Sequence, residues 1–207
     1  AVAYGYIGLA NEFLNYIQIF SIAVNSMAAR FVMIEYEKNN IFEVKGYYTS
    51  LFGINLILSF IIAIIGFAFI VNIESIINVS YQEPGDIKVL WIFMLGNFIL
   101  SLLGVAYQIV FFLKRRFEIE ALRSVIASLI QGGVLLICYS FFSTYIWYVG
   151  VAMLFAGIYT FIFNVRYTKK KILSFEISKK YFDWLFIKNL VKSGFWISIT
   201  HLSTLFL

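Results

Sequence analysis

Long stretches of this chain contain no charged side chain. The three longest cover residues 46–73, 89–113 and 124–165, and apolar residues fill most of each. The hydrocarbon core of a bilayer is about 30 Å thick, and about 20 apolar residues cross it as an α-helix. The first two stretches are therefore each long enough for one membrane-spanning helix. The third is long enough for two, which we expect to divide near Ser143 and Thr144.

The same pattern predicts five complete spans and the beginning of a sixth. Backbone amides find no water inside a bilayer, so spans of this length must be helical. We therefore expect an all-α fold, a polytopic transmembrane helix bundle. The predicted spans are Tyr6–Arg30, Tyr47–Val71, Val89–Leu113, Ser124–Phe142 and Ile146–Asn164, and the sixth begins near Gly194.

Two shorter features lie outside the predicted spans. Pro84, the only proline, is followed by Gly85, and this pair predicts a turn between the second and third spans. Between Asp183 and Val191, apolar residues at helical spacing predict a short helix in the membrane interface, with Asp183 as its N-cap. We expect residues 166–192 to form a basic cytoplasmic connector that contains this helix.

Composition and charge add a membrane orientation. Hydrophobic residues make up 62% of the chain, above the roughly 45–50% of soluble domains. Of the 16 lysines and arginines, all except Lys88 lie between spans one and two, between spans three and four, or after span five. Basic residues collect on the cytoplasmic side of membrane proteins, so these connections are predicted to be cytoplasmic. Topology thus explains the net charge of +5, and we expect no nucleic-acid partner.

Uncharged polar side chains recur along three of the predicted spans. Within each span they are three, four or seven residues apart, which places them on one helix face. Such side chains either hydrogen-bond neighbouring helices or face a water-filled cavity. We interpret three aligned stripes as the lining of a hydrated central cavity. The stripes are Asn11, Asn15, Gln18 and Asn25 in the first span, Asn97, Ser101, Gly104 and Gln108 in the third, and Ser124, Ser128, Gln131 and Cys138 in the fourth.

Two ionisable residues near the spans are candidates for more specific roles. Glu12 adjoins the first stripe and could bind a coupling cation or proton, or it could simply be hydrated at the outer interface. Arg30, at the inner end of the first span, could bind an anionic headgroup, or it could equally be an interfacial anchor. The sequence shows no phosphate-binding glycine loop, metal-ligand cluster or nucleophile with an obvious base. We therefore expect neither an enzyme nor a metal or cofactor.

Several segments resemble bacterial polysaccharide and oligosaccharide flippases, in the superfamily that includes multidrug and toxin extruders. Tyr4–Asn11 and Asn25–Phe31 resemble the second transmembrane helix of that family. Looser similarities follow at Tyr47–Ser50, Ile146–Gly150, Tyr167–Lys170, Phe182–Trp184 and Ser193–Ser198. The resemblance implies that residues 1–207 are a fragment of the N-terminal lobe of a two-lobed transporter, extending into the first helix of the second lobe.

The resemblance also implies a function. Such flippases move a polyprenyl-diphosphate-linked oligosaccharide from the cytoplasmic to the outer leaflet of the bacterial plasma membrane by alternating access, for surface polysaccharide or lipopolysaccharide biosynthesis. On this interpretation the polar stripes and the two arginines nearest the cytoplasmic mouth bind the substrate head, the arginines through its phosphates. The residues are Asn11, Asn15, Gln18, Asn25, Arg30, Asn97, Gln108, Arg123 and Gln131.

Partners and alternatives follow from the same interpretation. We expect the protein to contact membrane lipid, the lipid-linked oligosaccharide, a polysaccharide polymerase and assembly proteins. Two other functions stay open. One is a cation-coupled multidrug extruder of the same superfamily, which would use Glu12 as its coupling site. The other is a membrane enzyme of polysaccharide assembly, for which the predicted outer loops are short.

Overall fold

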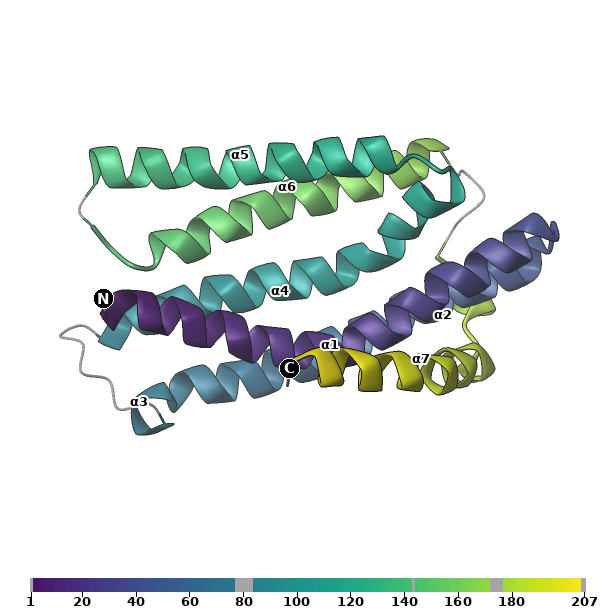
Figure 1. The fold of residues 1–207 in the computed structure, drawn as a ribbon, viewed down its shortest axis with the longest axis horizontal. Coiled ribbons are helices and arrows are strands. Elements are labelled where there is room, and N and C mark those ends of the chain that lie inside the picture. The colour runs from purple at the N-terminus through teal and green to yellow at the C-terminus, as the bar shows by residue number, and fades with distance from the viewer. Residues whose placement is uncertain (1, 77–83, 143, 172–176, 206–207) are drawn as a thin grey trace.

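Helices form all the regular structure in the part of the chain that the structure describes, which confirms the all-α prediction. The structure is a computed structural model that describes residues 2–76, 84–142, 144–171 and 177–205. Within these ranges only the backbone is described for residues 2–4, 19–20, 22–24, 26, 75–76, 84, 179 and 195–205. The long helices run back and forth along one axis (Figure 1).

Five long helices correspond to the five predicted spans. They are α1 (Val2–Glu37), α2 (Ile41–Val71), α4 (Pro84–Leu113), α5 (Phe117–Phe141) and α6 (Tyr148–Lys171). The last four are long and apolar enough to cross a membrane. α1 is also longer than the about 20 residues that a crossing needs, but some of its side chains are not described, so its span stays a prediction. α5 and α6 are separate helices, as predicted for the third charge-free stretch.

These helices extend beyond the charge-free stretches that predicted them. α2 includes Lys45 and α5 includes Arg123, although the sequence pattern assigned both residues to connections. A helix that crosses the hydrocarbon core continues into the headgroup region, where a charged side chain can find water or polar protein partners. The absence of charge therefore marks the hydrocarbon-spanning part of a helix and not its ends.

The structure differs from the prediction in two connections. Pro84 begins α4 instead of forming a turn, and proline suits this position because the first helical N–H has no partner within the helix. The expected interfacial helix and the sixth span form one continuous helix, α7 (Trp184–Leu205). Its N-cap is the predicted one, since Asp183 Oδ1 accepts a hydrogen bond of 2.8 Å from the Leu185 N–H. The sequence pattern did not predict the short helices α3 (Ile73–Ile76) and η1 (Lys179–Tyr181).

α4 is the central helix of the bundle. In Figure 1 it lies between the α5–α6 pair and the group of α1, α2 and α7, and it contacts α1, α2, α5 and α6. Glycines bring α6 close to it. A Cβ on Gly150 would lie 2.9 Å from the Leu90 carbonyl oxygen, and one on Gly157 would overlap the side chain of Asn97. Small residues let transmembrane helices approach closely in this way.

The basic connections meet at one end of the bundle. There Lys114 Nζ donates a hydrogen bond of 3.1 Å to Tyr36 Oη, which joins the α4–α5 connection to the end of α1. Arg115 lies 3.8 Å from Glu37 at the same place. α6 ends in three lysines at this end of the molecule (Figure 1). A single basic end is what the predicted topology requires, with this end in the cytoplasm.

Candidate functional site

Three adjoining cavities lie beside α4, and we call them together the amide hollow. Their volumes are about 340, 220 and 160 Å³, and Ser101 lines all three. Side chains from α1, α4, α5 and α6 form the wall. Its polar members are Asn11, Asn15, Gln18, Ser21 and Asn25 from α1, Asn97, Ser101 and Gln108 from α4, Gln131 from α5, and Thr160 and Asn164 from α6.

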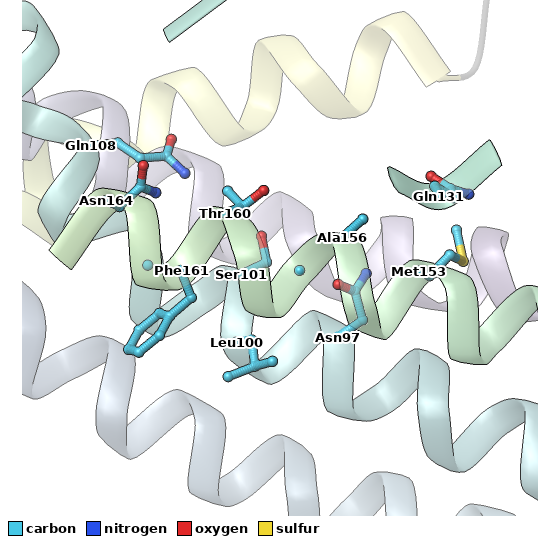
Figure 2. A pocket seen from close by; sticks show the side chains of 12 residues that line it. Asn97, Leu100, Ser101, Gln108, Gln131, Met153, Ala156, Thr160, Phe161 and Asn164 are labelled. Carbon is cyan, nitrogen blue, oxygen red and sulfur yellow. The ribbon is translucent and has the colours of Figure 1, made fainter. Parts of the chain in front are cut away.

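Figure 2 shows the part of the hollow between α4 and α6. Ser101 and Gln108 from α4 gather there with Thr160 and Asn164 from α6, and Gln131 approaches from α5. None of the described residues that line the three cavities carries a charge. Amides donate and accept hydrogen bonds, and hydroxyls do both as well. The wall is therefore suited to a ligand rich in hydroxyl groups.

The structure brings two of the three predicted stripes together. All four members of the stripe on α1 line the hollow, and so do all four members of the stripe on α4. The third stripe, on α5, contributes only Gln131 among the described lining residues. Ser124 Oγ and Ser128 Oγ are exposed and donate to carbonyl oxygens one turn earlier in α5, at 3.0 and 3.1 Å. A stripe marks a helix face but does not say which way that face points.

Sequence reasoning missed three polar side chains of the wall and one beside it. Ser21 lines the hollow from α1, one turn from both Gln18 and Asn25, so the predicted stripe could have included it. Thr160 and Asn164 line the hollow from α6, and Asn55 of α2 lies fully buried behind it. Their signal is present in the charge-free stretches, where any amide or hydroxyl is unusual. It is weak because two residues one turn apart, or one amide alone, do not make a stripe.

Asn25 joins two helices at the edge of the hollow. Its Nδ2 donates to Ser21 Oγ at 2.6 Å, and its Oδ1 accepts a hydrogen bond of 3.0 Å from Asn55 Nδ2. Both polar atoms of this amide therefore have partners within the protein. Asn25 thus holds α1 against α2, which is a packing role that polar side chains often have between transmembrane helices.

Arg123 lies within a helix interface and not at an open mouth. Its side chain is 7% exposed, and Nη1 donates a hydrogen bond of 2.6 Å to Asn164 Oδ1. Nη2 lies 3.7 Å from Glu120 Oε1, and the guanidinium lies 5.3 Å from the centre of the Phe111 ring. The phosphate-binding role of Arg123 stays a prediction. α5 begins at Phe117, so Arg123 belongs to the second turn of this helix and packs against α6. A cation that is buried there requires polar partners.

Glu12 and Arg30 are both exposed on α1, and neither belongs to the described wall of the hollow. Glu12 follows Asn11, which lines the smallest cavity, and adjacent residues of a helix point in different directions. The carboxylate therefore projects from a neighbouring face. The coupling-ion role of Glu12 and the phosphate-binding role of Arg30 stay predictions.

Comparison with known proteins finds a distant relative. The chain is 22% identical over 205 residues to the "Uncharacterized membrane protein EpsK" of Bacillus subtilis (strain 168). The match covers 98% of this chain but 40% of the relative, so the chain spans less than half of that protein's length. No family model and no solved structure matches. The chain is thus a multi-pass membrane protein that is distantly related to a bacterial membrane protein.

Proposed function

We propose that this chain is part of a flippase that moves a polyprenyl-diphosphate-linked oligosaccharide from the cytoplasmic to the outer leaflet of a bacterial plasma membrane. The observation that carries the proposal is the amide hollow, an uncharged cavity among apolar helices whose wall combines amides and hydroxyls with apolar side chains. Its amides and hydroxyls can replace the water around sugar hydroxyls, whereas an apolar cavity would leave those hydroxyls without partners. No bond is made or broken, so the protein is a transporter and not an enzyme.

Alternating access is the mechanism that we propose. The hollow binds the sugar head while the lipid tail stays in the bilayer, and this bundle then rocks against a second one so that the head reaches the other side. Contacts within the bundle support movement as a unit. Gly157 brings α6 against α4, and the hydrogen bond between Arg123 and Asn164 ties α5 to α6. The wall then keeps its shape while the bundle moves.

The extruder alternative depends on Glu12. A coupling carboxylate should face the transport cavity, but Glu12 is exposed and lies outside the described wall. Amides occupy that wall instead, which favours a sugar over a cationic drug. If expression confers drug resistance and Glu12→Gln removes it, the extruder replaces our proposal.

Gene deletion and complementation with the full-length protein test the proposal. We expect the deletion strain to accumulate lipid-linked repeat units that face the cytoplasm and to lose its surface polymer. Complementation with the wild-type protein should restore the polymer. Normal surface polymer in a deletion strain that has no second flippase would contradict the proposal.

A double substitution in the hollow tests the site itself. Asn15→Leu with Gln18→Leu removes two exposed amides from the α1 wall, so we expect transport to be abolished while the protein still accumulates in the membrane. The matched control, Ser124→Leu with Ser128→Leu, makes the same kind of change on α5 outside the described wall and should transport normally. Failure of the first variant to accumulate would show that these amides support packing.

A further inference from the structure

A second groove runs along α6, separate from the amide hollow. Its volume is about 360 Å³. It occupies the C-terminal half of the helix, which ends in the three lysines of the basic end. The lining residues are Tyr159, Ile162, Phe163, Arg166, Tyr167 and Lys170. None of them lines the hollow, so the proposed transport path does not account for this groove.

Three aromatic rings form the floor of the groove. Tyr159, Phe163 and Tyr167 follow one another at intervals of one turn, and successive ring centres lie 6.0 and 6.1 Å apart. Tyr167 also stacks on buried Phe111 of α4, with 5.0 Å between ring centres. This contact holds the floor against the bundle. The floor is therefore a fixed apolar surface along which a hydrocarbon chain can lie.

Two cations lie beside this floor, one turn apart. Arg166 and Lys170 are exposed, and neither forms an ion pair within the ranges that the structure describes. Arg115 and Arg116 at the same end differ, since they lie 3.8 and 3.0 Å from carboxylate oxygens. Two unpaired cations next to an apolar floor complement a phosphate group that carries acyl chains.

We propose that this groove binds an anionic phospholipid of the cytoplasmic leaflet, with phosphatidylglycerol as its occupant. The phosphate lies between Arg166 and Lys170, and one acyl chain follows the rings toward Tyr159. From Lys170 to Tyr159 the helix rises about 16 Å. This length is close to half of the about 30 Å hydrocarbon core, which is the depth of one leaflet. Phosphatidylethanolamine fits less well, because its ammonium group would lie next to the two cations.

Lipid binding to the purified full-length protein tests this proposal. Native mass spectrometry would follow titration with phosphatidylglycerol and, separately, with phosphatidylethanolamine. We expect Arg166→Gln with Lys170→Gln to weaken phosphatidylglycerol binding roughly 30-fold, since each basic residue near a membrane surface contributes about 1 kcal/mol toward an anionic lipid. Binding of phosphatidylethanolamine should not change.

The matched control removes the same charge from other faces of the same turn. Lys169→Gln with Lys171→Gln should weaken phosphatidylglycerol binding less than threefold, because neither lysine lines the groove. Arg166→Lys with Lys170→Arg keeps both charges and should bind within threefold of the wild type. Equal losses in the two glutamine variants would overturn the proposal in favour of general surface attraction, as would equal wild-type affinity for the two lipids.

A competition measurement separates this lipid from the proposed substrate. A polyprenyl diphosphate added at the same concentration should leave phosphatidylglycerol bound to the wild-type protein. Displacement at equal concentration would assign the groove to the lipid-linked substrate and overturn our proposal. Phe163→Ala, which shortens the floor, should weaken phosphatidylglycerol binding while leaving the thermal unfolding temperature unchanged. An unchanged affinity would show that the acyl chain does not lie on the rings.

Discussion

Uncharged polar side chains occur in two settings within this bundle, and the two settings differ in exposure. Asn15 and Gln18 line the hollow and are exposed. Asn55 and Asn164 are fully buried and have hydrogen-bond partners on another helix, and Asn164 does so although it also borders the hollow. Amides of the same chemistry therefore have different tasks. The exposed ones can bind a ligand, whereas the buried ones hold helices together, and residue type alone does not distinguish them.

Removing a buried side chain that is a hydrogen-bond and ion-pair partner of its neighbours should have the largest effect on stability. Arg123→Leu leaves Asn164 Oδ1 buried without its hydrogen bond and Glu120 without its cation. We expect the free energy of unfolding to fall by about 3 kcal/mol. Unfolding of the full-length protein in mixed micelles with increasing SDS, followed by tryptophan fluorescence, measures this change. Arg30→Leu is the matched control, since Arg30 is exposed, and a cost equal to that of Arg123→Leu would contradict the comparison.

Adding a methyl group where α6 approaches α4 should have the next largest effect on stability. In Gly157→Ala the added methyl group overlaps the Asn97 side chain, so the helices must separate or the amide must leave the hollow. We expect a loss of about 2 kcal/mol in the same unfolding measurement. Gly132→Ala on α5 is the control, because nothing lies within 4 Å of its added Cβ. That substitution should be neutral or slightly stabilising, since alanine favours helix over glycine.

Removing a single amide between two helices should reduce stability less than either of these changes. Asn55→Leu removes the hydrogen bond to Asn25, and we expect a cost of about 1 kcal/mol, the usual size for polar contacts between transmembrane helices. Asn15→Leu in the hollow should change stability by less than about 0.5 kcal/mol, although it should lower transport. If Asn15→Leu proves the more destabilising of the two, exposure does not separate binding amides from packing amides.

The smallest effect should come from the α5 stripe. Ser124→Ala with Ser128→Ala removes only hydrogen bonds to the carbonyls of the same helix. We expect a change of less than about 0.5 kcal/mol in unfolding and normal surface polymer in the complementation assay. A loss of transport would mean that this face of α5 turns toward the hollow during the cycle.

The candidate site was predictable where polar residues repeat and hidden where they do not. The stripes on α1 and α4 have four members each, and both stripes face the hollow. α5 has an equally regular stripe, but α5 packs mainly against α6, and two of its serines remain exposed. α6 contributes Thr160 and Asn164 without any stripe. Periodicity therefore identifies a polar face, and packing against other helices decides what that face meets.

The sequence by itself determined that this chain is an all-α membrane protein with one basic end. These properties depend on the local cost of placing each residue in hydrocarbon or water, so they can be read along the chain. Only the tertiary structure decided that Arg123 is buried, that α1, α4 and α6 share a hollow, and that a basic aromatic groove lies along α6. Each of these depends on how a helix is rotated about its own axis. That rotation is decided by close contacts between residues far apart in the chain, such as Gly157 with Asn97.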